Sequence, residues 1–381
     1  MELRTIDTIK DLSGKTVLLR IDCDVDIENG RILDDTRLDV ALPTIEFLLK
    51  KGADINIVGH LGRPKTTDNG QLTTDNSKFT LVPIAHWFAK KFKVQSSKYK
   101  VGKFEAWKIT DRINLIENIR FFKGEEDNPS SASGRAFARD LALLGDVYVN
   151  DAFAVSHRAH ASIVGVTKFL PSYAGLHLKK EVHELSKILN NPPPGQRPSG
   201  AAKRPLAVLI GGAKIETKLP LVSKMHAIAD YVLVGGEIAE QTRVLIKVQH
   251  EKIKEPKSAV LVADLREDGF DITPKSIENF KQILGLAGTI VWNGPVGLIR
   301  PPIQNSKFKI QNSEDTERGT RELAQFIVRT SAYKVVGGGD TLAYLRRIDL
   351  LSKFDFVSMG GGAMLEFLSG HKLPALKTLE K

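Results

Sequence analysis

The sequence contains a single cysteine, Cys23, and no long hydrophobic run. One cysteine excludes an internal disulfide framework and a cysteine-based zinc cluster. No segment approaches the roughly 20 consecutive apolar residues that a transmembrane helix needs. Residues 1–15 alternate charged side chains with isolated apolar ones, which is not the pattern of a secretory signal. These absences lead us to expect a cytoplasmic protein with no membrane partner.

Several familiar motifs are also missing. Gly14-Lys15-Thr16 could end a P-loop, but Ile9 stands where its first glycine should be. Residues 337–342 fail the pattern G-x-G-x-x-G at the last position. His183-Glu184 is not followed by the second histidine of a zinc-protease helix. Any phosphate or nucleotide chemistry must therefore use a different arrangement of residues.

The 381 residues are 42% hydrophobic, which is too apolar for a disordered chain and long enough for two domains. The 55 Lys and Arg residues exceed the 45 Asp and Glu residues, giving a net charge of +10. Such an excess suits either nucleic acid or anionic metabolites. The basic run at Lys90, Lys91 and Lys93 is predicted to be a solvated helix face. Because no RNA-binding signature is present, nucleic acid is kept only as a minor alternative.

Short apolar runs alternate with amphipathic segments along the chain. Helices are predicted over 36–51, 179–189 and 273–286, with Thr36 capping the first and Pro274 opening the last. The runs are apolar on both faces, as buried parallel strands are, and they span 16–22, 54–58, 112–116, 146–150, 206–210, 231–234, 259–262, 289–292, 334–336 and 354–357. This alternation predicts the α/β class, with doubly wound, Rossmann-like parallel sheets.

A segment rich in proline and glycine, residues 190–205, separates two halves of the sequence. No helix or central strand accepts that composition. We predict an N-terminal domain over 1–175, an interdomain helix and linker over 176–204, and a C-terminal domain over 205–365. Residues 304–313 repeat Gln-Asn-Ser beside two prolines and are predicted to be an inserted surface loop.

Basic side chains follow the predicted strands of the N-terminal half. Ligands of open α/β sheets bind outside the carboxyl ends of the strands. Those ends lead to four residues, His60, Arg63, Arg120 and Arg158, and Arg37 opens the first helix nearby. A single arginine is most often part of a surface ion pair. Several guanidinium groups at one edge instead suit a small, multiply anionic ligand, because each binds a carboxylate or phosphate at two points.

Glycine follows the predicted strands of the C-terminal half, at residues 211–214, 235–236, 293–297, 337–341 and 360–363. Glycine lets the backbone approach phosphates closely, and a following helix presents free N–H groups. Lys214 and Lys218 are four residues apart and so share one helix face. Asp340 is a candidate ligand for Mg²⁺. A lone Gly-Gly is as often only a tight turn, but five such loops predict a nucleotide site.

Taken together, these motifs resemble the phosphoglycerate kinase family over essentially the full length. The matching stretches are Leu19–Asp22, Asp34–Arg37, His60–Pro64, Glu117–Phe121, Asn150–Phe153, His157–His160, Gly211–Lys214 with Lys218, Trp292–Pro295, Gly337–Thr341 and Gly360–Ala363. The resemblance implies reversible phosphoryl transfer between 1,3-bisphosphoglycerate and Mg²⁺-bound ADP, giving 3-phosphoglycerate and ATP. It also implies two domains joined by a hinge, a C-terminal tail, 366–381, that packs on the N-terminal domain, and a monomer.

The resemblance also carries roles residue by residue. Phosphoglycerate binding falls to Asp22, Asp24, Arg37, His60, Leu61, Gly62, Arg63, Arg120 and Arg158. Nucleotide binding falls to Lys214, Lys218, Gly236, Asn293, Pro295, Gly338, Gly339, Asp340 and Thr341, with Asp340 as the metal ligand. For the transferring phosphoryl group, positive charge and backbone N–H groups come from Arg37, Lys214 and Gly361.

Four positions depart from the family pattern. Asp24 replaces an asparagine, and Arg300 stands near the position of an acidic residue that binds ribose. Met359 and Met364 replace small hydroxyl residues beside the last glycine loop. These departures leave a second reading open, in which the protein is a low-activity or non-catalytic relative that binds nucleotide or phosphoglycerate.

Overall fold

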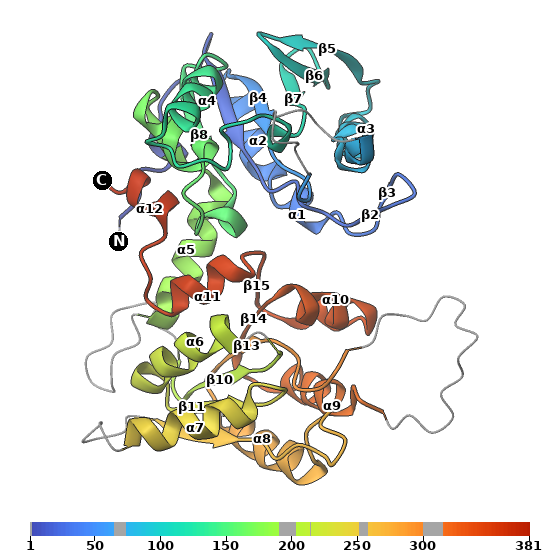
Figure 1. Ribbon diagram of the computed structural model, residues 1–381, viewed down its shortest axis with the longest axis vertical. Coiled ribbons are helices and arrows are strands. Elements are labelled where there is room, and N and C mark those ends of the chain that lie inside the picture. Colours follow the sequence, from blue (N-terminus) through green and yellow to red (C-terminus); the bar gives the residue numbers. More distant parts are fainter. Residues whose placement is uncertain (1, 65–73, 190–202, 214, 251–257, 300–314) are drawn as a thin grey trace. The chain divides into compact units, whose positions relative to one another are not determined.

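The computed structural model describes residues 2–64, 74–189, 203–213, 215–250, 258–299 and 315–381 (Figure 1). It divides the chain into two compact units. Unit 1 comprises Met1–Val182 with Lys372–Lys381, and unit 2 comprises His183–His371. The first division falls within helix α5, Leu176–Leu189, and residues 190–202 of the predicted linker lie outside the described residues. Each unit has its own sheet and is described by itself.

Unit 1 is built on a 7-stranded sheet in the order β5-β6-β7-β4-β1-β8-β9. Strands β7, β4, β1, β8 and β9 are parallel, whereas β5 and β6 form an antiparallel hairpin at one edge. The chain order reverses between β1 and β8, which places a crevice at their carboxyl ends. The bounds are β1 Thr16–Arg20, β4 Asp54–Val58, β5 Ser97–Val101, β6 Phe104–Lys108, β7 Ile113–Ile116, β8 Val147–Asn150 and β9 Ser172–Ala174. A separate two-stranded ribbon joins β2, Ile27–Glu28, to β3, Arg31–Ile32.

The central strand of unit 1 is buried on both faces. Val17 and Leu19 pack in one hydrophobic cluster, while Leu18 packs in the other. Helices cover the sheet from both sides, as its two-sided apolar sequence predicts. They are α1 Thr36–Asp39, α2 Leu42–Lys50, α3 Val82–Phe92, α4 Ala132–Ala142, the first part of α5, and α12 Pro374–Leu379.

The prediction of one helix over 36–51 is wrong, because the chain forms α1 and α2 with a break between them. Pro43 has no N–H to donate to the carbonyl of Asp39, four residues earlier, and its ring would clash there. The first helix ends at Asp39 and the second begins at Leu42. Thr36 is also not the cap that we expected: it is the first helical residue, and its backbone N–H donates to the Asp34 carboxylate at 3.0 Å.

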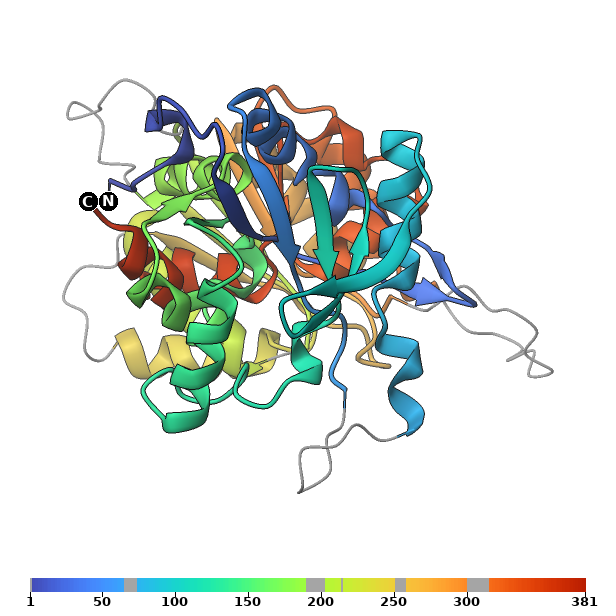
Figure 2. The ribbon, with the colours of Figure 1, turned by 90° about the horizontal axis from the view of Figure 1, so that it is seen from above.

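The two ends of the chain meet in unit 1, as both views show (Figures 1 and 2). The N–H of Arg4 donates to the carbonyl of Leu379 at 2.8 Å, and the N–H of Lys381 donates to the carbonyl of Glu2 at 3.1 Å. In addition, Ala375 donates to the carbonyl of Ser156 at 3.1 Å. Residues 372–381 are therefore part of unit 1 although they follow unit 2 in the sequence.

Unit 2 contains a 6-stranded, fully parallel sheet in the order β12-β11-β10-β13-β14-β15. Its chain order reverses between β10 and β13. The strands are β10 Leu206–Ile210, β11 Tyr231–Val234, β12 Ala259–Val262, β13 Thr289–Asn293, β14 Tyr333–Gly337 and β15 Phe356–Ser358. The helices are α6 Ile215–Ile228, α7 Ala239–His250, α8 Pro274–Leu286, α9 Arg318–Ile327, α10 Gly339–Arg347 and α11 Gly362–Leu368.

The two sheets confirm the predicted fold class of doubly wound α/β units. The predicted start of α8 is also confirmed, because the Thr273 hydroxyl accepts the N–H of Ser276 at 3.2 Å and Pro274 is the first helical residue. The β5–β6 hairpin was not predicted. Within the described part of the chain, no helix combines the length and apolar character that crossing a membrane requires.

Candidate active site

The predicted cationic residues of unit 1 converge at the carboxyl edge of its sheet, with Asp24 at the centre. The Asp24 carboxylate accepts the N–H of Gly62 at 2.8 Å, and its carbonyl accepts the Arg37 guanidinium at 2.6 Å. The carbonyl of Gly62 in turn accepts Nη1 of Arg120. These three contacts tie together the loops after β1, β4 and β7 and the first helix.

The arginines of this edge differ in burial. Arg120 is buried, pairs with Glu126 at 2.9 Å, and has a pKa lowered mainly by burial. Arg158 is half-buried, close enough to Arg120 and His60 for its charge to act on both. Arg63 is exposed, and the described residues offer it no ion pair. An exposed, uncompensated guanidinium can turn toward an arriving anion.

His60 is buried beneath these arginines. Its Nδ1 lies 2.8 Å from Nη2 of the buried Arg20. Burial, followed by the charges of Arg20 and Arg120, lowers the pKa of His60 well below its usual value. The imidazole is therefore neutral, and because a guanidinium can only donate, Nδ1 must accept and the proton sits on Nε2. That Nε2 is buried and has no partner among the described residues, so it is a donor available to a ligand.

Asp22 lies across the switch point between β1 and β8. One of its carboxylate oxygens accepts the N–H of Ala154 at 3.1 Å, and the other has no partner within the described part of the chain. Burial raises the pKa of Asp22, while the charges of Arg37 and Arg20 oppose that shift. Leu61, in the loop after β4, is held by the loop after β7, because its carbonyl accepts the Asn118 side-chain amide at 2.8 Å.

Sequence reasoning missed three residues behind this edge: Arg20, Glu125 and Ser162. Arg20 donates through Nε to the Ser162 hydroxyl at 3.2 Å, and that hydroxyl lies 2.6 Å from the Glu125 carboxylate. The signal for Arg20 was available, since a charged residue ends an otherwise apolar buried strand. Glu125 gave no signal, because adjacent acids in a loop are ordinarily solvated.

In unit 2 the predicted residues after β13 and β14 contact one another. The Lys218 ammonium donates to the side-chain and backbone oxygens of Asn293, the latter at 3.3 Å. Gly338 precedes α10 with φ of 97°, and a Cβ there would lie 3.2 Å from the Asn293 side chain. The Thr341 hydroxyl accepts the N–H of Gly294 at 2.9 Å. These contacts bring Lys218, Asn293, Gly338 and Thr341 to one edge.

The other glycine loops pack backbone against backbone at the same edge. Gly236 is buried with φ of 71°, and a Cβ there would lie 2.8 Å from the nitrogen of Gly212 and 3.3 Å from the carbonyl of Pro295. By contrast, a Cβ on Gly339 or on Gly361 would meet no atom within 4 Å. The space over these two glycines, at the starts of α10 and α11, is open to a ligand. Lys214 lies outside the described residues.

A metal ion at this edge would need ligands from the substrate phosphates as well as from the protein. Among the described residues no group of three or more His, Cys, Asp or Glu side chains could hold a metal ion. Asp340 is exposed in the first turn of α10. One free carboxylate fits Mg²⁺, which proteins commonly bind through one or two carboxylates together with substrate phosphates.

The methionines that depart from the family pattern fill space in this edge. Met364 is fully buried, its sulfur 3.7 Å from the Asn293 amide nitrogen, and a Cβ on Gly337 would overlap it. Met359 is also buried. Met364 therefore contacts Asn293, a residue predicted to bind the nucleotide. Arg300 lies outside the described residues.

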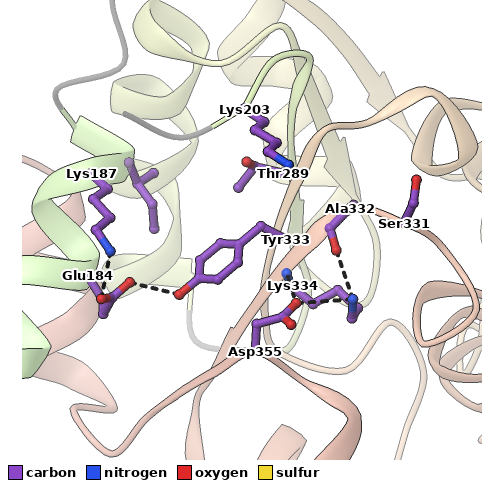
Figure 3. Close-up of a pocket in the computed structure, with 10 residues that line it drawn as sticks. Glu184, Lys187, Lys203, Thr289, Ser331, Ala332, Tyr333, Lys334 and Asp355 are labelled. Atoms are coloured by element: carbon purple, nitrogen blue, oxygen red, sulfur yellow. Dashed lines mark hydrogen bonds and ion pairs between the residues drawn. The ribbon is translucent and has the colours of Figure 1, made fainter. Parts of the chain in front are cut away.

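The opposite edge of this sheet holds a cavity of about 380 Å³ (Figure 3). Its carboxylates are already engaged: Glu184 binds Lys187 and the Tyr333 hydroxyl, each at 2.7 Å, and Asp355 lies 3.0 Å from Lys334. The cavity lies where β13 and β14 begin, so it is separate from the glycine loops. None of the predicted site residues lines it.

Comparisons with known proteins identify the family to which the chain belongs. The family model described as Phosphoglycerate kinase matches residues 6–257 and 242–371. A phosphoglycerate kinase of Dictyoglomus turgidum is 35% identical over 412 residues, covering 97% of each chain. One of Coprothermobacter proteolyticus is 33% identical over 424 residues, covering 100% of this chain and 99% of the relative.

Solved structures give the same result. The phosphoglycerate kinase of Coxiella burnetii is similar with a TM-score of 0.75 and 31% identity, covering 99% of each chain. That of Pyrococcus horikoshii has a TM-score of 0.73, and at 24% identity it supports the fold alone. With the family model matching most of the chain and relatives above 30% identity over nearly all of it, this chain belongs to the phosphoglycerate kinase family.

Proposed function

We propose that the protein catalyses reversible transfer of the acyl phosphate of 1,3-bisphosphoglycerate to Mg²⁺-bound ADP, giving 3-phosphoglycerate and ATP, a reaction of glycolysis and gluconeogenesis. One observation carries the proposal. A single chain of this family has both an arginine-rich edge with a free histidine donor and a second edge of glycine loops that leave space for phosphates. The first suits a triose with two anionic groups and the second suits a nucleotide.

Unit 1 would bind the phosphoglycerate. Its carboxylate and phosphate match the two-point hydrogen bonding of guanidinium groups, and Nε2 of His60 can donate one further bond. Asp24 would hold Arg37 and Gly62 in place through the two contacts described above. The residues proposed to bind are Asp22, Asp24, Arg37, His60, Leu61, Gly62, Arg63, Arg120 and Arg158.

Unit 2 would bind the nucleotide. The first N–H groups of a helix have no acceptor within the helix, and the space over Gly339 at the start of α10 is open, so phosphate oxygens can accept these N–H groups there. Lys218 is oriented by Asn293, so its charge is fixed at the edge. The residues proposed to bind are Lys214, Lys218, Gly236, Asn293, Pro295, Gly338, Gly339, Asp340 and Thr341. When bound, Mg²⁺ would neutralise phosphate charge, and Asp340 is the residue that would hold it.

The chemical step needs charge stabilisation rather than a covalent intermediate. Transfer from an acyl phosphate passes through a loose transition state with negative charge on the equatorial oxygens. Arg37, Lys214 and the N–H groups beside Gly361 are proposed to stabilise that charge. Because the two substrates are assigned to different units, turnover also requires a hinge motion. A monomeric state and a cytoplasmic location complete the proposal.

A coupled assay of purified protein tests this function directly. We expect ATP formation from 1,3-bisphosphoglycerate and ADP, and ATP consumption with 3-phosphoglycerate, both abolished when Mg²⁺ is chelated. Binding of either substrate without turnover would instead establish the non-catalytic reading. Salt-sensitive binding to random duplex DNA, without turnover, would favour the minor nucleic-acid alternative.

A further inference from the structure

A continuous line of buried polar groups runs from Glu125 to the free edge of His60. The Glu125 carboxylate accepts two hydrogen bonds from Ser162, the backbone N–H at 2.9 Å and the hydroxyl at 2.6 Å. Having donated to Glu125, the hydroxyl oxygen can only accept from its other neighbour, Nε of Arg20, at 3.2 Å. Nη2 of Arg20 then donates to Nδ1 of His60 at 2.8 Å.

The direction of each bond in this line is fixed by its neighbours. A carboxylate only accepts and a guanidinium only donates, so the Ser162 hydroxyl between them has one possible orientation. Arg20 is anchored at a third point, because its Nη1 donates to the carbonyl of Ile21. Three partners in three directions fix the plane of the guanidinium, and with it the hydrogen that meets His60.

Because these polar groups are buried, losing any one of the hydrogen bonds between them costs free energy. Arg20, Glu125, Ser162 and His60 are each no more than 2% exposed. Burial raises the pKa of Glu125 to about 7, while Arg20 and the two bonds from Ser162 act to lower it. Without Glu125, the buried charge of Arg20 would lose one of two nearby counter-charges, the other being Asp22, and the Ser162 hydroxyl would lose its acceptor.

We propose that Glu125 and Ser162 are positioning residues that act through Arg20 to hold His60 as a neutral imidazole with its Nε2–H directed at the phosphoglycerate. The inference rests on the proposed function for the identity of the ligand. Neither Glu125 nor Ser162 belongs to the residues proposed to touch substrate. Substitutions of Glu125 or Ser162 should therefore change the binding of phosphoglycerate but not of nucleotide. They should do so only by changing the protonation or the orientation of His60.

Two substitutions remove different hydrogen bonds of this line. Both variants are measured near pH 8, because the pKa of Glu125 is about 7 and its carboxylate is ionised above that pH. Glu125→Gln keeps the side-chain shape but removes the charge, and its amide NH2 then faces either the Ser162 N–H, which cannot accept, or the Ser162 hydroxyl, which must turn to accept it. Ser162→Ala removes the hydroxyl that connects Glu125 to Arg20. We expect each to raise KM for 3-phosphoglycerate about tenfold, as loss of a buried hydrogen bond typically does, with KM for ATP and kcat within about twofold of wild type.

The double variant and two controls separate positioning from general damage. Because both substitutions break one line, the double variant should lose about as much as either alone, rather than the product of the two losses. Ser162→Thr keeps the hydroxyl, so its KM for 3-phosphoglycerate should stay within about twofold of wild type. Tyr148→Phe removes a buried hydrogen bond of 2.7 Å to the carbonyl of the same Ser162. It should lower Tm but leave KM for 3-phosphoglycerate unchanged.

A spectroscopic measurement tests the inference without any turnover. In protein labelled with ¹⁵N-histidine, with the His60 signals assigned from a His60→Gln variant, the free wild-type protein should show the Nε2–H tautomer alone. Glu125→Gln and Ser162→Ala should show a mixture with the Nδ1–H tautomer or the imidazolium. If Glu125→Gln does not fold, Glu125→Asp, which keeps the charge but shortens the reach, is measured in its place.

The outcomes distinguish the two proposals. A wild-type protein that has no phosphoglycerate-dependent turnover but shows the expected tautomer shift would overturn the function and leave the positioning line supported. An unchanged His60 tautomer in folded variants, multiplicative losses in the double variant, or an equal rise in KM with Tyr148→Phe would overturn the positioning role and leave the function untouched.

Discussion

The candidate binding edges of the two sheets differ in the groups that form them. In unit 1 the edge consists of charged side chains, many of them buried and connected by hydrogen bonds, such as Asp24 to Gly62 and Arg20 to His60. In unit 2 it consists mainly of glycine backbone, where a Cβ on Gly236 or Gly294 would strike another loop. In both sheets the strand order reverses beside the first strand of the unit, β1 or β10, so topology alone does not explain the contrast.

This difference indicates which kind of substitution should impair each edge. A buried charge is costly unless it is paired, so unit 1 depends on the partners of each charged group. A glycine loop has no side chain to misplace, so unit 2 depends on the absence of side chains and on backbone conformations that other residues adopt only with strain. Removing a charge should therefore damage unit 1 chemistry, whereas adding a methyl group should damage unit 2.

The largest effect is expected for Arg37→Ala in unit 1. One positioned charge at a phosphoryl transition state is worth on the order of 10²–10³ in rate, by analogy with the loss of an oxyanion-hole donor. Turnover should fall by that factor while nucleotide affinity, assigned to unit 2, changes little. Steady-state kinetics with both substrates provide the measurement. A variant that keeps more than about half of wild-type turnover would exclude this role for Arg37.

The matching change in unit 2 is Gly294→Ala. Gly294 has φ of 93°, and a Cβ there would lie 2.1 Å from the carbonyl oxygen of Gly211. Strain and overlap together should lower the free energy of unfolding by about 3 kcal/mol, measured by urea denaturation. Gly339→Ala is the control, because its Cβ would meet no atom. It should leave stability intact but raise KM for ATP, and unchanged ATP kinetics would argue against phosphates binding over Gly339.

A third test uses the buried carboxyl groups of unit 1. Burial raises the pKa of Asp151 from the usual 3.8 to about 7, although Thr44 and the N–H of Leu178 donate to it. Between pH 5 and pH 7 the unfolded chain binds fewer protons at this group than the folded chain, so the contribution of Asp151 to stability falls as pH rises, by about 2 kcal/mol. Asp151→Asn should lack this loss, so its stability relative to wild type should improve across that range. A stability difference independent of pH would contradict the assignment.

The sequence predicted the fold class correctly because strand and helix periodicities follow from local chemistry. The runs that became β1, β4, β10 and β13 are apolar on both faces, and each is a buried central strand. The β5–β6 hairpin was missed because its first strand is mostly exposed and alternates polar with apolar residues. The break before Pro43 was also predictable, but the apolar face on either side of it suggested one continuous helix.

The site residues assigned from motifs remain predictions, although the structure brings most of them together at two edges. What the sequence could not reveal is the second layer in unit 1. Glu125 and Ser162 are separated from Arg20 by 105 and 142 residues, and no spacing rule connects them. Only the folded chain shows that a loop acid, a serine and a strand arginine share one buried line.

A smaller effect in the opposite direction is expected for Asp24→Asn. The ligand proposed for this edge is anionic, and two like charges 4–6 Å apart repel by about 3–4 kcal/mol at an effective dielectric near 20. The surrounding arginines offset much of that repulsion. An asparagine oxygen can still accept the N–H of Gly62, so the loop should stay in place. KM for 3-phosphoglycerate should therefore fall several-fold, with KM for ATP unchanged. A rise would show that the negative charge of the Asp24 carboxylate is needed beside Arg120.

The smallest effect is expected in unit 2, for deletion of residues 304–313, which lie outside the described residues. The described residues on either side of this segment meet, because the Thr316 hydroxyl donates to the carbonyl of Leu298 at 2.8 Å. The chain thus leaves and returns at one point, and the entropy of closing a loop changes only slowly with its length. Deletion should leave Tm and kcat nearly unchanged. The sensitive readout is KM for ADP, since residues 293–297 of the proposed nucleotide edge lie just before the segment in the sequence. A tenfold rise in that KM would mean that the inserted loop, and not the glycine backbone alone, recognises the nucleotide.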